Sequence, residues 1–219
     1  MAISKLNYNS LNVTPSANAA IGFGSGADDL ETGSGGGDMV FIKKLTASSS
    51  SSLSFVHGSS SVILDNTYKE YVFTFNNMHP ATNQAIFSVN MSVDGGSNYN
   101  VAKQTTNIEQ YHAENGSASG IGYVTGKDLA NGTGILNLSS ATGNGNDESC
   151  SGSLHLFNPS STTFATHFIS DVQGSYGATY SINHKVAGYC NNTAAINAVQ
   201  FTFSSGNIDA GDICLYGIS

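Results

Sequence analysis

Apolar and small polar residues alternate along much of this chain, and this period of two constrains its fold more than any other feature. Residues 87–93 read Phe-Ser-Val-Asn-Met-Ser-Val, so that every second side chain is apolar. Such alternation is typical of a β-strand with one face in a core and the other in water. The water-facing positions carry Ser and Asn, and only 10% of all residues are charged, against roughly a quarter in an average globular protein. These features favour a structural or adhesive role on an exterior surface over catalysis.

Similar strand patterns recur at short intervals from residue 39 onward, and no window of a dozen residues has a convincing helical period. Turn-forming pairs that contain Gly separate several of them, at 94–96, 115–116, 131–132 and 144–145. Many short strands with such turns predict an all-β fold, an antiparallel β-sandwich with jelly-roll topology as the first choice. The expected strands are 40–46, 53–57, 71–75, 86–93, 100–111, 135–138, 153–157, 164–172, 179–189, 198–203 and 212–218.

Residues 1–38 differ from the rest of the chain. Their apolar residues are scattered among Asn and Ser without a sustained period, and a Gly-rich stretch with several carboxylates follows. Such a segment has too little apolar area to fold alone, so we expect an extended N-terminal arm and Gly-rich linker, either flexible or ordered by a partner. The β-sandwich domain is expected over residues 39–219. The apolar positions of the arm are Ile3, Leu6, Tyr8, Leu11 and Val13.

Charge and composition argue against several classes of function. The net charge is −8 and all seven basic residues are Lys, so the Arg forks that favour phosphates and base edges are absent from the sequence. We therefore expect no nucleic-acid partner. No run reaches the roughly 18 apolar residues of a membrane helix, and the first residues lack the apolar stretch of a secretory signal. The expectation is synthesis in a cytoplasm, without a signal peptide and without membrane insertion.

Motifs for nucleophilic or phosphate chemistry are incomplete in this sequence. The string nearest to a Gly-x-Ser-x-Gly elbow, at 116–120, has Ala118 in the central place. Residues 122–127 resemble a phosphate-binding loop, but the glycine spacing is one residue short and Asp128 replaces the Ser or Thr that binds Mg²⁺. The three cysteines, Cys150, Cys190 and Cys214, are too widely spaced for a zinc motif, and we expect reduced, structural thiols.

The histidines and carboxylates give no strong metal signal. Six histidines stand singly, and His155 and His167, in neighbouring predicted strands, could face one another as a pair. A metal on a three-fold axis, with one histidine from each subunit, is the alternative. Acidic loops at 28–38 and 144–148 carry Ca²⁺-type ligands without the spacing of a known Ca²⁺ loop. We expect no catalytic residue, no metal and no cofactor.

Four strings together carry a resemblance to a known group of proteins. This chain resembles virion-associated proteins of tailed bacteriophages, of the kind found in marine phages and cyanophages and described as tail-fibre or structural proteins. The resemblance covers nearly the whole length, and its strings have no catalytic meaning. They are MAISKLNYNSLNVTP at 1–15, MVFIKKLTASSSSSLSFVHGSSSVILDNTYKEYVFTFNNMHPAT at 39–82, LHLFNPSST at 154–162 and SGNIDAGDICLYGIS at 205–219.

The resemblance implies a virion location, with a short N-terminal segment attached to the particle and a β-rich body that projects outward. On that basis residues 3–13 are the docking arm, the chain forms a homotrimer, and its partners are portal, tail or capsid proteins. The sequence has neither shaft repeats nor heptads, so a short fibre, a spike or a capsid decoration is expected rather than a long fibre.

Three hypotheses of function follow. The first is a non-enzymatic virion protein that aids adsorption to the host. The second is a free carbohydrate-binding module or lectin, and the third is a hydrolase of host polysaccharide, which would need two carboxyls roughly 5–9.5 Å apart. Ser, Asn and Tyr in loops such as 97–100 and 189–192 suit hydrogen bonding and stacking with a host cell-surface glycan, although turns explain them equally.

Overall fold

The structure is a computed structural model that describes residues 20–23, 30–33, 39–177 and 179–218. The chain divides into two compact units, Met1–Val40 and Phe41–Ser219. The apolar positions of the expected docking arm, from residue 3 to residue 13, lie outside the described residues.

A short hairpin is described in the first unit. Strand β1 (Ala20–Phe23) pairs antiparallel with β2 (Leu30–Gly33), so that Ala20 lies opposite Gly33. The sequence predicts no strand before residue 39, and this is wrong for these two segments. Four residues are too few for an alternation of apolar and polar side chains to stand out from its surroundings.

The second unit is built on a sheet of eight strands, in the order β3-β14-β5-β10-β11-β12-β7-β8. From β14 to β8, each strand runs antiparallel to its neighbours. The strands are β3 (Met39–Thr46), β5 (Glu70–Pro80), β7 (Lys103–Ala113), β8 (Ser119–Tyr123), β10 (Cys150–Phe157), β11 (His167–Tyr176), β12 (Tyr180–Cys190) and β14 (Ile208–Ile218).

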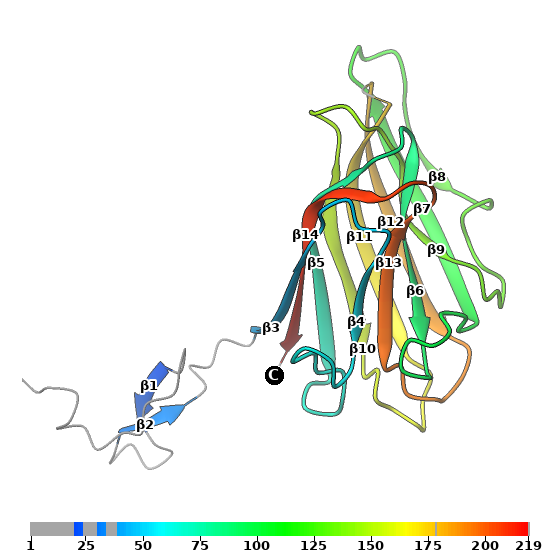
Figure 1. The fold of residues 1–219 in the computed structure, drawn as a ribbon. Helices are drawn as coiled ribbons and strands as arrows, with labels where there is room; N and C mark the ends of the chain where they lie inside the picture. Colours follow the sequence, from blue (N-terminus) through cyan, green and yellow to red (C-terminus); the bar gives the residue numbers. More distant parts are fainter. Residues whose placement is uncertain (1–19, 24–29, 34–38, 178, 219) are drawn as a thin grey trace, which may run out of the picture. The chain divides into compact units, whose positions relative to one another are not determined.

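A smaller sheet of four antiparallel strands packs against the larger one, in the order β4-β13-β6-β9. Figure 1 shows it in front of the larger sheet. Its strands are β4 (Leu53–Val56), β6 (Ala85–Ser92), β9 (Leu136–Thr142) and β13 (Ala198–Phe203). In the second unit the described residues form two antiparallel sheets and no helix, so the predicted all-β sandwich is confirmed.

Phenylalanine rings join the two sheets in the core. Phe201 of β13 lies with its ring centroid 5.3 Å from that of Phe73 and 5.2 Å from that of Phe75, both on β5. Within the smaller sheet it stacks on Phe87 at 5.8 Å and meets the edge of Phe55 at 6.2 Å. All five side chains are buried. The inward-facing half of the alternation therefore supplies the core, as expected for a sandwich.

Long alternating runs are where the expected strands agree best with the structure. The expected strand at 198–203 coincides with β13, and the one at 86–93 is shifted by one residue from β6. Strand β8 is not predicted, because its Ser-Gly-Ile-Gly-Tyr sequence offers two apolar side chains among glycines. The expected turns contain Gly95, at φ +72°, and Asn131, at φ +54°, in the left-handed region that these residue types tolerate. No helix in the described part of the chain is long and apolar enough to cross a bilayer.

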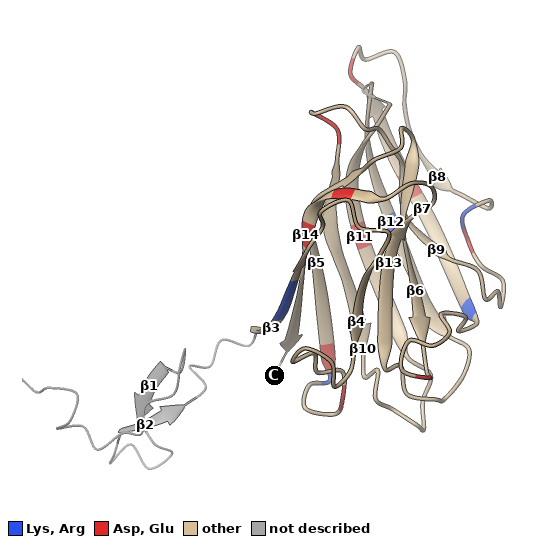
Figure 2. Ribbon diagram, viewed as in Figure 1, with Lys and Arg blue, Asp and Glu red and all other residues tan. Residues whose placement is uncertain are grey.

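Charged side chains are sparse on this framework. Figure 2 shows Lys, Asp and Glu as isolated positions on strands and loops, with long stretches that carry none. The edge strand β3 carries the adjacent pair Lys43 and Lys44, and Lys44 forms an ion pair of 3.3 Å with Asp212 of β14. Charged groups are therefore a minor part of the described surface, which also exposes large apolar side chains such as Phe41, Ile121 and Phe164.

Candidate functional site

Strand register places three ring side chains in one row across the larger sheet. Phe157, near the end of β10, pairs with His167 at the start of β11, and His167 pairs with Tyr189 of β12. Tyr189 in turn pairs with Gln104 of β7. Side chains directly opposite one another across strands lie close enough to interact, and the rings of His167 and Tyr189 are 5.7 Å apart between centroids. We call this set the aromatic row.

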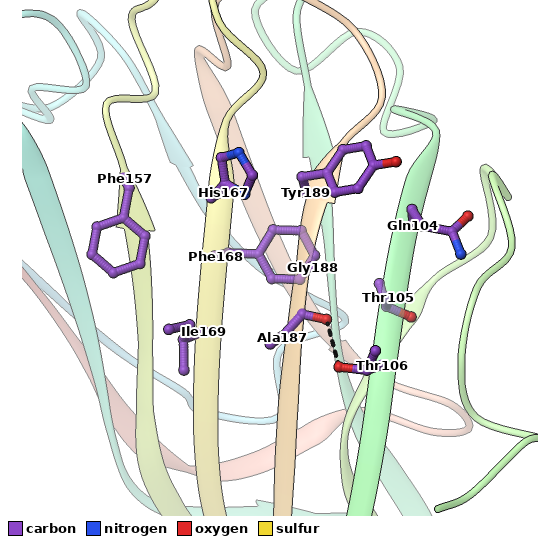
Figure 3. A pocket seen from close by; sticks show the side chains of 10 residues that line it. All are labelled: Gln104, Thr105, Thr106, Phe157, His167, Phe168, Ile169, Ala187, Gly188 and Tyr189. Atoms are coloured by element: carbon purple, nitrogen blue, oxygen red, sulfur yellow. Dashed lines mark hydrogen bonds between the residues drawn. The ribbon is translucent and has the colours of Figure 1, made fainter.

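A shallow groove of about 370 Å³ runs along the aromatic row. Figure 3 shows the rings of Phe157, His167 and Tyr189 side by side on three neighbouring strands, with Ile169 and Thr106 below them. Ile169 is 52% exposed, and the Thr106 hydroxyl donates a 3.4 Å hydrogen bond to the carbonyl of Ala187. The groove is therefore a shallow, mostly apolar strip, and the carboxylate of Glu70, which lies opposite Phe157, is at one end of the row.

A glycine lies at the centre of the groove. Gly188 of β12 has no side chain, and a Cβ built there would lie 2.9 Å from Cζ of Phe168. The Phe168 ring therefore packs directly beneath the backbone of β12, where any larger residue would push it away. Gly188 allows β11 and β12 to keep the aromatic row in register over a closely packed base.

The chemistry of the groove suits a neutral, hydroxyl-bearing ligand. None of the described residues that line it is Asp, Glu, Lys or Arg. Aromatic faces stack on the C–H faces of sugar rings, and the amide of Gln104 and the hydroxyl of Thr106 offer hydrogen bonds at the side. Without a carboxylate among these residues, the groove has no general acid or base of the kind used by glycosidases.

A second hollow, of about 540 Å³, opens between the two sheets. Its lining includes Glu109 and Tyr111 of β7, Tyr180 of β12, Ser140 of β9, and Lys127 from the loop after β8. The groove uses the opposite ends of β7 and β12, at residues 104–106 and 187–189, so the two hollows are separate. We call this second hollow the cleft.

Three polar side chains form a bonded cluster in the cleft. The Oε2 atom of Glu109 accepts a 2.8 Å hydrogen bond from Nζ of Lys127 and a 2.5 Å hydrogen bond from the hydroxyl of Ser140. Lys127 also donates to that hydroxyl at 2.7 Å. Burial alone would raise the pKa of Glu109, but the hydrogen bonds from Lys127 and Ser140 and the positive charge of Lys127 together outweigh it and lower that pKa. A carboxylate with a lowered pKa is a weak general base.

A buried histidine lies behind this cluster. His184 of β12 is 1% exposed, and its Nε2 is 3.4 Å from Oε2 of Glu109. Burial lowers the pKa of His184 to about 4, and the positive charge of Lys127 contributes to the shift. His184 is therefore neutral at pH 7, and neither of its ring nitrogens has a hydrogen-bond partner among the described residues.

The two histidines singled out by the sequence do not face one another. His155 pairs across the strands with Ile169, and its Nδ1 is 2.6 Å from Oε1 of Glu70. His167 belongs to the aromatic row instead. The register of β10 against β11 offsets the two histidines by two residues, which the sequence alone does not specify. The described part of the chain has no group of three or more His, Cys, Asp or Glu side chains placed to hold a metal.

Other residues considered in the sequence have structural partners. Lys127, from the loop that resembles a phosphate site, is held by Glu109 and Ser140. Glu148 accepts a 2.6 Å hydrogen bond from the backbone N–H of Gly145 and so closes the acidic turn at 144–148. The three cysteines are buried and unpaired, and burial raises the pKa of Cys150 and of Cys190 to about 12. These two thiols stay protonated and are poor nucleophiles at neutral pH.

Sequence reasoning identifies neither the groove nor the cleft as a site, although His167, Tyr189 and the loop that carries Lys127 each attract attention separately. The expected strand at 179–189 ends at Tyr189, where a loop at 189–192 begins, and in the structure Tyr189 lies inside β12, next to the last residue of that strand. Phe157 and His167 carry no local signal of a shared site, because they meet Tyr189 only through strand pairing. Glu109 and Ser140 are 31 residues apart and come from different sheets.

Neither a protein-family model, nor a curated protein, nor a solved structure matches this chain.

Proposed function

We propose that this chain is a non-enzymatic structural protein of a tailed-bacteriophage particle, a short fibre, spike or head-surface decoration. In this proposal residues 1–38 attach the protein to portal, tail or capsid proteins, and the sandwich faces outward as a homotrimer. The outward face then contacts a glycan of the host cell surface and aids adsorption. The proposal combines the resemblance of the sequence with the strand order and the groove.

The strand order is the observation that carries the proposal. Strands β3, β4, β5 and β6 alternate between the larger and the smaller sheet, and β9, β10, β13 and β14 do the same. The orders β3-β14-β5-β10 and β4-β13-β6-β9 are those of two interlocked Greek keys, so we interpret the fold as a jelly roll. The pairs β7–β8 and β11–β12 then extend the larger sheet beyond the eight strands of the jelly roll. Jelly rolls recur in viral capsid proteins and in lectins.

The character of the surface supports an exterior position. Uncharged polar faces lose little when salt screens ion pairs, whereas a surface stabilised by exposed Lys and Glu pairs would weaken. The described strands carry few charges, and those beside the aromatic row contact one another, Asp171 with Lys185 and Glu70 with His155. The residues that line the groove include no Asp, Glu, Lys or Arg, so they can contact glycans without forming ion pairs.

Removal of the arm tests the virion part of the proposal. In a phage that carries this gene with residues 1–38 deleted, we expect the protein to disappear from purified particles because its attachment segment is lost. Mass spectrometry of the particles measures incorporation, and circular dichroism of the purified variant checks that the β fold is intact. Incorporation of a folded deletion variant at the wild-type level would contradict the proposal.

A free carbohydrate-binding module or lectin is the second candidate, and the groove favours it. The groove needs no residue before 104, so a lectin would bind glycan equally well without residues 1–38. This candidate predicts a soluble monomer or dimer that is not found on particles. The same deletion experiment therefore separates the two candidates, because a lectin is absent from purified particles with or without its arm.

A further inference from the structure

The cleft has the features of a ligand site, and this site is separate from the groove along the aromatic row. It opens between the sheets, and its lining comes from β6, β7, β9, β11 and β12 together with Ala118 and Lys127. A volume of about 540 Å³ is in the range of small-molecule sites. The groove, by contrast, lies on the outward face of the larger sheet alone.

Three tyrosines form the apolar wall of the cleft. Tyr180 meets Tyr111 with ring centroids 6.0 Å apart at 72°, and meets Tyr176 at 6.1 Å and 63°. The nearly perpendicular rings hold one another in place and are preorganised before any ligand arrives. Tyr111 and Tyr176 remain more than one-third exposed, so their surfaces are available to a ligand.

The polar cluster in the cleft has hydrogen-bonding capacity left over. All the hydrogen bonds that the described residues give to the Glu109 carboxylate go to Oε2, which leaves Oε1 as an acceptor. The Lys127 ammonium has three protons and donates to Glu109 and Ser140, so one donor remains. The cluster therefore offers an acceptor and a donor beside the tyrosine wall.

The charges of the cluster select the class of ligand. Glu109 and Lys127 cancel one another, so an anionic ligand would lie beside the carboxylate and a cationic ligand beside the ammonium. A neutral polyol avoids charge repulsion with either side chain, because each of its hydroxyls can donate to Glu109 or accept from Lys127. A pyranose ring adds an apolar C–H face that matches a tyrosine ring.

We propose that the cleft is a second glycan site, which takes the terminal ring of a neutral sugar between the tyrosine wall and the Glu109–Lys127 pair. This inference rests on the proposed adhesive function and adds an end-binding site to the groove.

Free monosaccharides test this site on the full chain. The probes are the methyl glycosides of glucose, galactose, mannose and N-acetylglucosamine at millimolar concentrations. Because the chain has ten tyrosines and no tryptophan, binding is followed by tyrosine fluorescence and by saturation-transfer NMR. We expect at least one probe to bind and to lose about tenfold in affinity in the Tyr176→Ala variant.

Two further variants keep the test decisive. Glu109→Gln keeps the shape of the side chain but removes its charge, and should weaken the same probe. Tyr123→Ala, a half-exposed tyrosine on β8 that lines neither hollow, is the matched control and should bind as the wild type does. Failure of all four probes to bind, or equal binding by Tyr176→Ala and wild type, would overturn the inference. Failure of the proposed adhesive function would appear instead as unchanged polysaccharide binding by Tyr189→Ala, a groove variant.

Discussion

Lys103 is the most unusual single residue of the sandwich, because a lysine side chain is fully buried in the core. Its Nζ donates 2.7 Å hydrogen bonds to Oδ1 of Asn90 and to the carbonyl of Val101. These bonds satisfy two of its three protons, and burial lowers the pKa of Lys103 to about 8. A buried amine of this kind links the stability of the fold to pH.

The pH dependence of stability tests this environment. Below pH 8 the lysine is protonated in both states, whereas between pH 8 and 10.5 the unfolded chain still holds a proton that the folded chain has released. The free energy of unfolding should therefore rise with pH across this window, by up to about 3 kcal/mol from this residue. Urea unfolding of the wild type and of Lys103→Met measures it as their difference, in which other titrating groups cancel. A difference that stays constant from pH 8 to 10.5 would show that the pKa is not lowered.

At the scale of single residues, the sequence could predict burial but not sites. The inward half of each alternating run identifies side chains such as Phe73 and Phe201 as core. Lys103 and Glu109 occupy similar inward positions on β7, yet their partners come from β6, β9 and loops distant in the sequence. The sequence does not predict which polar side chains contact one another, because those contacts depend on strand register and on sheet packing.

Among the elements, β12 depends on a glycine where it crosses the groove. A Cβ at Gly188 would clash with the carbonyl of Gln104 on β7 and lie 2.9 Å from the ring of Phe168 on β11. Gly188→Ala should therefore lower the free energy of unfolding by about 1–3 kcal/mol, because backbone and ring must both shift. Gly122→Ala on β8 is the matched control, since a Cβ there has no atom within 4 Å. Equal stability of the two variants by urea unfolding would contradict this packing.

The two sheets should depend strongly on Phe201 of β13. Its ring contacts Phe73 and Phe75 of the facing sheet, so Phe201→Ala leaves a cavity at the centre of the core. We expect a loss of about 3–5 kcal/mol in the free energy of unfolding. Phe164, which is 70% exposed, is the control, and its change to Ala should alter stability by less than about 0.5 kcal/mol. A loss below about 1 kcal/mol for Phe201→Ala would mean that the core is packed differently.

Strands could be predicted from the sequence wherever alternation lasts for six residues or more, as in β6 and β13. Short or glycine-rich strands could not be, and β1, β2 and β8 are the examples. The order of the strands could not be predicted from local sequence patterns either, because β14 pairs with β5 across more than a hundred residues of chain. The aromatic row likewise depends on the pairing of β10, β11 and β12 with one another. No local sequence pattern predicts it.

The whole molecule combines a sandwich with a charge-poor outer face and a separate unit at residues 1–40. In the proposed function, the first residues attach the protein to the phage particle and the sandwich projects from it. The larger sheet then contacts the host. The sandwich itself is confirmed, whereas the jelly-roll interpretation, the virion location and the glycan partner are proposals. The glycan proposal for the groove depends on the outward face of the larger sheet being a binding surface.

Binding of the full chain to the envelope polysaccharide of the bacterial host tests that claim most directly. Isothermal titration should show saturable binding by the wild type and by Tyr123→Ala. The same titration of Tyr189→Ala should show an affinity at least about tenfold weaker, because the aromatic row loses one of its three rings. Equal affinity of Tyr189→Ala and the wild type, or no binding by either, would contradict the account.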